Sequence, residues 1–228
     1  MSFTLHRRSR TLAADDRGRR RWRINVDTVT VPGEALGIIV CDMWDRHWCR
    51  GAAERVAEMA PAMNGTLHAA RDKGALIIHA PSETVDFYRD TPAYRRAAEA
   101  PAATPPATES REDPPLPIDD SDGGCDSRDN PGGVDERVWS RQHRAIEIDQ
   151  SRDLISDRGS RIYNVVRQRK IRQVVIMGVH TTMCILNRSF GIKQLVRWAV
   201  EVALCRDLTD CMYNPQKPPY VSHAKGTE

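Results

Sequence analysis

The chain has 228 residues, 40% of them hydrophobic, which is enough for one α/β domain with a buried core and room for insertions. The net charge is only +3, so the composition gives little support for a nucleic-acid-binding protein. No apolar run approaches the roughly 20 residues of a membrane-spanning helix. We therefore expect neither a nucleic-acid nor a membrane partner.

Eight arginines lie within the first 23 residues. Residues 1–21 are predicted to form an irregular polar arm, followed by a short edge strand over Trp22–Val26. A solvated basic arm is the simpler interpretation of the arginines, and contact with an acidic partner such as nucleic acid is the alternative. The pair Arg7–Arg8 is followed by no hydrophobic stretch, which argues against a secretion signal.

The six cysteines form no Cys-X-X-Cys pair, which argues against a structural zinc site. An even number permits disulfides, but a chain of this length with apolar strands does not need them. We therefore expect reduced cysteines and a cytoplasmic location. The six residues are Cys41, Cys49, Cys125, Cys184, Cys205 and Cys211.

Continuous apolar runs predict buried strands. They are Ala35–Cys41, Ala75–His79, Val174–Met177 and Val200–Cys205, with a shorter strand expected at Ala145–Ile148. Apolar stripes at helical spacing predict helices over Ala52–Lys73, Thr84–Ala100 (interrupted near Pro92), Ser160–Lys170 and the segment after Thr182. This order predicts a three-layer, doubly wound α/β fold, in which a mainly parallel sheet of about six strands carries helices on both faces. One domain over residues 1–228 is expected.

Residues 101–136 hold seven of the fourteen prolines, together with clustered aspartates and the pair Gly123–Gly124. A segment this long without expected helices or strands is either functional or poorly ordered. A lid over a site and a plain insertion loop are equally compatible with the sequence.

Cys184 is the first candidate catalytic residue. The strand Val174–Met177 ends at Gly178, and Thr181 and Thr182 are candidate helix caps, so Cys184 falls into the first turn of a helix. Free backbone N–H groups and the helix dipole favour a thiolate there, so the pKa of this thiol is expected to fall. The same N–H groups are placed to hold a developing oxyanion. A buried structural cysteine is the alternative.

Asp42 is the second candidate, because it directly follows the strand Ala35–Cys41. The carboxyl ends of parallel strands open onto one edge of a sheet, where ligands bind in open α/β folds. A carboxylate beside a thiol can act as its base, and a cation beside that carboxylate keeps it ionised. Arg141, upstream of the strand at Ala145–Ile148, is the expected source of the cation.

These residues together resemble a known family. The segment IIVCDMWD, a basic residue before a strand, and GVHTTMC opening a helix are similar to the isochorismatase-like cysteine hydrolases, which include nicotinamidases and N-carbamoylsarcosine amidases. The resemblance runs from about Ala35 to Pro215. It implies a parallel sheet of about six strands, assembly as a homodimer or homotetramer, and an Asp–Lys–Cys triad acting on amides, with Asp42 and Cys184 as two of its members.

The resemblance also implies a cis peptide bond between Val179 and His180. The backbone N–H groups of His180 and Cys184 would then line the oxyanion hole. Residues 221–228 predict no closing helix or strand, and relatives of this type usually continue further, so a truncated end is one interpretation.

The triad lysine has no counterpart here, since no lysine lies between residues 74 and 169. Arg141 lies in the expected region, and arginine supplies charge but cannot lose a proton. Proton transfer would then fall to Asp42. A working Asp42–Arg141–Cys184 variant is favoured, and the alternative is a weak or inactive family member that serves as a binding or assembly protein.

The expected reaction is hydrolysis of a small amide or ureido C–N bond through a thioester on Cys184, with a small-molecule substrate and no cofactor. Asp45, His47 and His79 lack the spacing of a dedicated metal site, so no metal is expected. The candidate pocket residues are Trp44, His47, Trp48, Trp139 and Asn187, although core packing explains the tryptophans equally well.

Overall fold

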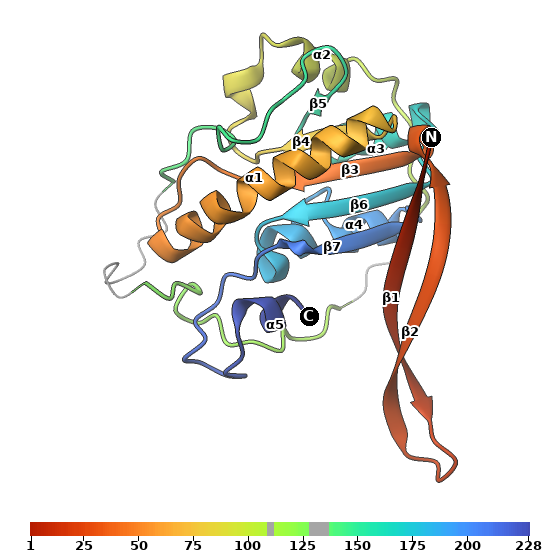
Figure 1. Cartoon of the computed structure of the whole chain (residues 1–228), viewed down its shortest axis with the longest axis vertical. Helices are drawn as coiled ribbons and strands as arrows, with labels where there is room; N and C mark the ends of the chain where they lie inside the picture. Colours follow the sequence, from red (N-terminus) through yellow and green to blue (C-terminus); the bar gives the residue numbers. More distant parts are fainter. Residues whose placement is uncertain (109–111, 128–136) are drawn as a thin grey trace.

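The fold is known from a computed structural model that describes residues 1–108, 112–127 and 137–228. A five-stranded parallel sheet forms its centre, in the order β5-β4-β3-β6-β7 (Figure 1). Its strands are β3 (Leu36–Cys41), β4 (Leu76–Ala80), β5 (Leu154–Ile155), β6 (Gln173–Gly178) and β7 (Val202–Thr209). The predicted doubly wound α/β class is confirmed, with five strands in this sheet in place of about six.

The middle strands are apolar along their whole length because helices cover both faces of the sheet. All six residues of β3 are buried. Successive side chains point to opposite faces, so Ile38 and Val40 join one apolar cluster while Ile39 and Cys41 join the other. The continuous apolar run in the sequence is the signature of this two-sided burial.

Helix α1 (Arg50–Asp72) covers one face and α3 (Gly159–Gln168) with α4 (Ile192–Arg197) the other (Figure 1). Val56, Met63 and Leu67 form the buried stripe of α1. The other described helices are α2 (Pro92–Ala98), α5 (His223–Thr227) and the short turns η1 (Gly33–Ala35), η2 (Val85–Tyr88) and η3 (Thr181–Ile185). None of the described helices is long and apolar enough to cross a bilayer.

The amino-terminal segment is not irregular, as expected, but strongly ordered. Strands β1 (Ser2–Ala14) and β2 (Arg20–Pro32) pair antiparallel over their full length and form a hairpin that projects from the sheet (Figure 1). Strand β2 was not predicted over its full length because the many arginines of this segment obscured the alternating β-branched residues of Asp27–Val31. At the base of the hairpin, Phe3, Leu5, Val29 and Val31 pack against the α1 side of the core.

Two further expectations are corrected. Residues 145–148 form no strand, although Ile146 is buried, because side chains satisfy their backbone groups: Asn64 accepts from the Glu147 N–H and the Gln142 amide donates to the Ile146 carbonyl. The strand that pairs with β4 is β5, six residues later. The end of the chain carries the short helix α5, where no helix was expected.

The expectation of six reduced cysteines is wrong for two of them. Cys49 and Cys125 form a disulfide, with Cα atoms 5.5 Å apart, while the other four are free thiols. The bond fastens the described part of residues 101–136 to the start of α1. A cytoplasmic location, which rested on reduced cysteines, stays a prediction.

The described parts of residues 101–136 contain no helix or strand. They are nevertheless attached to the body, since Ile118 is buried against Cys211 and Tyr213, and Asp122 accepts from the Asn214 amide. Residues 109–111 and 128–136 of this predicted insertion lie outside the described residues.

Candidate active site

Asp42 lies directly beyond the carboxyl end of β3, and its side chain is fully buried. Its φ of 47° is left-handed, a conformation that residues other than glycine rarely adopt. Two groups hold its carboxylate: the Ser82 backbone N–H donates to Oδ1 at 2.7 Å, and Arg188 Nε donates to Oδ2 at 3.0 Å. A carboxylate buried with these donors is positioned for chemistry and can stay ionised.

Cys184 lies in η3, which follows β6 through a sharp turn. The peptide bond between Val179 and His180 is cis, as the resemblance implied. Gly178 permits the close approach of β6 to β3, because a Cβ there would lie 2.0 Å from the Cys41 carbonyl oxygen. Burial and the Asp42 carboxylate raise the pKa of the partly buried Cys184 thiol, and the backbone N–H of His180 lowers it.

The two candidates meet where the winding of the sheet reverses. Strands β3 and β6 are neighbours, with later-joining strands on either side of them. In open α/β sheets this switch point is where ligands bind, beyond the carboxyl ends of the strands. The prediction that Asp42 and Cys184 share one edge of the sheet is therefore confirmed.

Arg188 is the cation that contacts Asp42, and the sequence analysis missed it. Its backbone N–H donates to the Cys184 carbonyl at 3.0 Å, so it lies one helical turn beyond the nucleophile. Its guanidinium bridges two carboxylates, with Nη1 3.2 Å from Glu83 Oε1. The spacing of four residues from Cys184 is the signal that could have found it.

The guanidinium of Arg141 lies over the Phe87 ring, 5.5 Å from its centroid. Its backbone N–H donates to Asp45 Oδ1. No ion pair links Arg141 to Asp42 among the described residues. Arg141, the cation expected at Asp42, thus lies over Phe87, and Arg188 makes the ion pair with the Asp42 carboxylate.

Burial and charge set the proton affinities at the site. Burial raises the pKa of Asp42, which the Arg188 charge partly offsets. Burial and the Asp42 charge raise the pKa of the Cys184 thiol far above its usual range, and Arg188 lowers it by less. The expected fall of the thiol pKa is therefore wrong, because desolvation and a like charge outweigh the helix terminus. The thiol of Cys184 is therefore neutral at rest.

Aromatic rings lie together near Asp42. Trp44 is buried and stacks on Trp139 with centroids 4.4 Å apart, and Trp139 in turn stacks on His47 at 5.6 Å. Trp48 lies 5.3 Å from His47. Burial lowers the pKa of His47 to about 3, so this ring is neutral and suits an apolar wall. Four of the five candidate pocket residues therefore cluster.

Asn187, the fifth candidate, is exposed and occupied elsewhere. Its amide nitrogen donates to the carbonyls of Thr182 and Met183, and its oxygen accepts from Lys193. These bonds tie Asn187 to the turn that carries Cys184.

His180 is buried, with Nδ1 3.3 Å from Asp210 Oδ2. This contact lacks hydrogen-bond geometry, and both ring nitrogens are without a hydrogen-bond partner among the described residues. Arg55 also contacts Asp210, at 3.0 Å, and together the His180 and Arg55 side chains lower the pKa of Asp210 to about 2. The chain segment after β7 is thereby held against the Cys184 turn.

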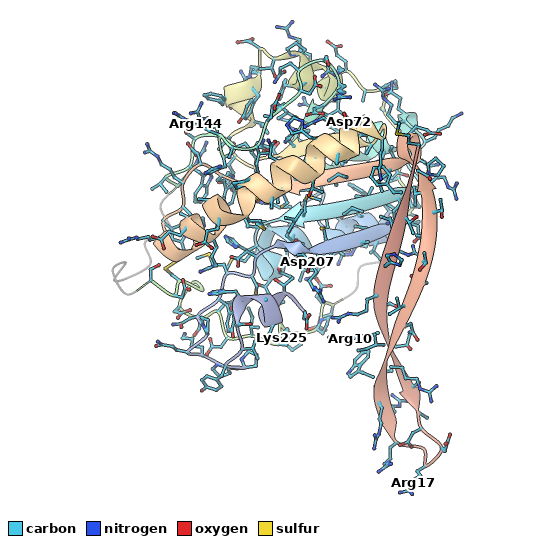
Figure 2. All side chains as sticks on the ribbon, viewed as in Figure 1. Arg10, Arg17, Asp72, Arg144, Asp207 and Lys225 are labelled. Atoms are coloured by element: carbon cyan, nitrogen blue, oxygen red, sulfur yellow. A yellow bond between two sulfur atoms is a disulfide. The ribbon has the colours of Figure 1, made fainter. Side chains whose placement is uncertain are left out.

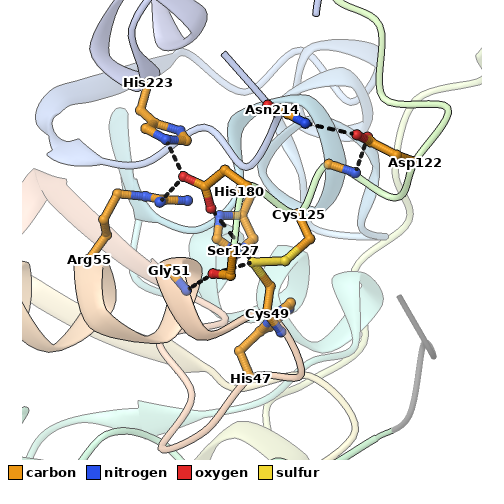
Figure 3. The surroundings of a disulfide bond; sticks show 12 residues. His47, Cys49, Gly51, Arg55, Asp122, Cys125, Ser127, His180, Asn214 and His223 are labelled. Atoms are coloured by element: carbon orange, nitrogen blue, oxygen red, sulfur yellow. Dashed lines mark hydrogen bonds and ion pairs between the residues drawn. A yellow bond between two sulfur atoms is a disulfide. The ribbon is translucent and has the colours of Figure 1, made fainter. Parts of the chain in front are cut away.

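The residues weighed for a metal site are engaged with other groups. Asp45 accepts from Ser140, and His79 lies between Gln142 and Asp153 in the core. Among the described residues, the one group of three or more His, Cys, Asp or Glu side chains whose ligand atoms all lie within 4.8 Å of one another is Cys49, Cys125 and Asp126. Figure 3 shows the two sulfur atoms bonded to each other, so they are not free to ligate an ion.

A cavity of about 510 Å³ is lined by residues that include Asp157, Ser189 and Trp198. None of Asp42, Cys184 and Arg188 lines it. The reactive groups therefore lie outside this cavity.

Comparison with known proteins finds likeness in structure but none in sequence. No protein-family model matches the sequence, and none of the curated proteins matches it. The fold is similar to a crystal structure described as a cysteine hydrolase from Pseudomonas syringae pv. phaseolicola 1448A, with a TM-score of 0.48 and 16% identity over 80% of this chain and 75% of that one. At this identity the likeness concerns the fold and says nothing of the residues that react.

Proposed function

We propose that the chain is a cysteine hydrolase of the isochorismatase-like kind, which cleaves a small amide or ureido C–N bond through a thioester on Cys184. The observation that carries this proposal is the linked set of Cys184, Asp42 and Arg188 at the switch point of the sheet. The Asp42 carboxylate acts on the Cys184 thiol, and Arg188 orients that carboxylate, which is the arrangement of an activated nucleophile.

Proton transfer accompanies attack in this mechanism. Asp42 takes the thiol proton as the Cys184 sulfur bonds to the carbonyl carbon, because the thiol is neutral at rest. Burial raises the pKa of Asp42, which makes it a stronger base than an ordinary aspartate. Arg188 is permanently charged and restrains the carboxylate without exchanging protons.

The remaining steps return every group to its starting state. The backbone N–H of His180 stabilises the oxyanion, together with that of Cys184. Asp42 then donates its proton to the leaving nitrogen, the C–N bond breaks, and a thioester remains. Asp42 finally deprotonates a water molecule that attacks the thioester. The C–S bond breaks, and Asp42 returns the proton to the Cys184 sulfur, which releases the acid and restores the thiol.

The test is ammonia release from a panel of small primary amides and ureido compounds. Wild-type protein should release ammonia from at least one of them, while Cys184→Ala should release none. Acid quenching during turnover should leave an acyl adduct on Cys184, detected by peptide mass spectrometry. Release that persists in Cys184→Ala, or neither release nor adduct across the panel, would overturn the proposal.

One observation favours a second candidate, a weak or inactive protein that binds ligands on the same fold. Burial and the Asp42 charge hold the Cys184 thiol neutral. A binding protein would bind compounds of the panel equally well as wild type and as Cys184→Ala, with no adduct and no ammonia in either case.

A further inference from the structure

The hairpin β1–β2 leaves the body after its base. The last residues of β1 that contact the body are Arg7, whose Nη1 donates to Gln173, and Arg8, which pairs with Glu228. Beyond them, the described interactions of the hairpin stay within it, such as Asn25 with Thr11. About six residue pairs, roughly 20 Å of strand at 3.4 Å per residue, therefore extend past the body (Figure 2, Arg10 and Arg17).

This outer part of the hairpin has one apolar face. Side chains two apart on each strand share a face, and the pairing of Leu12 with Trp22 places four large apolar residues together. These are Leu12, Trp22, Ile24 and Val26, hereafter the apolar stripe, which are 47%, 66%, 58% and 68% exposed. The opposite face is polar, with Ser9, Thr11 and Asn25.

A two-stranded ribbon with an uncovered apolar face is marginal in water. Its own body cannot cover the apolar stripe, because the hairpin projects away from it (Figure 1). The four apolar residues all lie on one face of the ribbon, whereas apolar residues scattered over a surface would lie on both. This pattern indicates that another surface covers that face.

The distribution of charge along the chain indicates which surface covers the apolar stripe. Residues 2–32 contain eight arginines and three aspartates, a net charge of +5, whereas residues 33–228 carry 26 basic and 28 acidic residues, a net charge of −2. Arg10 and Arg20, on the face of the apolar stripe, take part in no ion pair among the described residues. The body likewise carries exposed carboxylates that take part in no ion pair among the described residues, including Glu58 and Asp72 of α1.

We propose that the hairpin of one copy of this chain docks on the body of a second copy, with the apolar stripe as the buried contact and Arg10 and Arg20 paired with exposed carboxylates of that body. Reciprocal exchange of hairpins closes such a dimer and leaves no hairpin uncovered. Tryptophan and arginine around an apolar centre are typical of protein–protein contacts. A nucleic-acid contact is disfavoured, because the apolar side chains of Leu12, Ile24 and Val26 gain nothing from phosphates.

The test compares Ile24→Asp with Asn25→Asp by sedimentation velocity. Both put a carboxylate on the same strand of the hairpin, the first on the apolar stripe and the second on the polar face. Ile24 is exposed, so circular dichroism should show both variants folded. Wild type and Asn25→Asp should sediment at twice 25.7 kDa or more, and Ile24→Asp at 25.7 kDa. A monomeric wild type, an assembled Ile24→Asp or a dissociated Asn25→Asp would overturn the proposal.

A charge reversal separates the other possible partners. Arg10→Glu with Arg20→Glu should weaken the assembly at least tenfold if the hairpin meets exposed carboxylates of the partner body. A strengthened assembly would show that two hairpins meet each other and would overturn the proposal. Tight binding of labelled duplex DNA that falls steeply with salt and is unaffected by Ile24→Asp would favour nucleic acid instead.

Discussion

Asp42 is fully buried, and its charge depends on two donors, one from the backbone of Ser82 and one from Arg188. Only Arg188 carries a compensating charge, and its side chain is 29% exposed. The state of the proposed base is therefore set by a residue in the turn that follows the nucleophile.

Replacing Arg188 should change the pH dependence of the reaction. The Arg188 charge lowers the pKa of Asp42, so Arg188→Gln raises that pKa and the ionised base forms only at higher pH. The acid limb of kcat/KM should move upward, with a loss at neutral pH on the order of 100-fold. Steady-state ammonia release across pH measures both.

Arg188→Lys keeps the charge and should retain more activity, although it loses the fork geometry. Arg141→Gln should leave the limb in place, since that guanidinium lies over Phe87. An unchanged acid limb in Arg188→Gln, or a shifted one in Arg141→Gln, would indicate that Arg141 is the cation that sets the pKa of Asp42.

At this scale the sequence identified two of the three linked groups. Asp42 and Cys184 follow continuous apolar strands, and a polar residue in that position is visible without a structure. Arg188 was missed because the family pattern directed attention upstream of the strand at 145–148, away from the turn after Cys184. The direction of the thiol pKa was missed because burial is not visible in a sequence.

Among the elements, α1, β4 and β5 are connected by one buried cluster. Arg71 of α1 lies 2.6 Å from Asp153, just before β5, and His79 of β4 contacts the same carboxylate at 3.1 Å. Both members of the Arg71–Asp153 pair have side chains that are 1% exposed. This edge of the sheet thus depends on a charge pair without access to water.

Asp153→Asn should destabilise the fold by about 3–5 kcal/mol, because it leaves the Arg71 charge buried without its partner. Asp86→Asn is the matched control: Asp86 also lies 2.6 Å from an arginine, but both side chains are mostly exposed. That pair should contribute less than about 1 kcal/mol. Urea unfolding measures both, and equal losses would contradict the assignment.

The elements differ in how well the sequence predicts them. Buried parallel strands are apolar throughout, so β3, β4, β6 and β7 were found close to their true positions. The hairpin β1–β2 was missed because arginines are frequent in its outer half, and its β-branched residues are spread over two faces. The segment at 145–148 was mistaken for a strand because Ile146 and Ile148 alternate with polar residues.

At the scale of the whole molecule, a disulfide links two segments that are distant in the sequence. Cys49 and Cys125 lie 76 residues apart, and their disulfide links the start of α1 with the described part of residues 101–136 (Figure 3). The sequence does not show which of the six cysteines form a disulfide. Cys125 lies in an irregular segment, and such a segment has no periodic pattern from which its path could be predicted.

Breaking this disulfide should lower the free energy of unfolding by roughly 2–4 kcal/mol, since it removes a constraint on the unfolded chain. Urea unfolding with and without dithiothreitol measures the effect. The double variant Cys49→Ser with Cys125→Ser should unfold at the same midpoint in both conditions, matching reduced wild type. A wild type whose midpoint ignores dithiothreitol would contradict the bond.

The measurement that tests the proposed site most directly is the rate of Cys184 alkylation by iodoacetamide against pH, followed on the Cys184 peptide. Wild type should react slowly at neutral pH, with an apparent pKa above the usual value of about 8.5. Asp42→Asn should lower that pKa and speed the reaction at pH 8, because the carboxylate charge and its hydrogen bond with the thiol both raise it. An alkylation profile unchanged by Asp42→Asn would show that the two groups do not exchange a proton, and would contradict the mechanism.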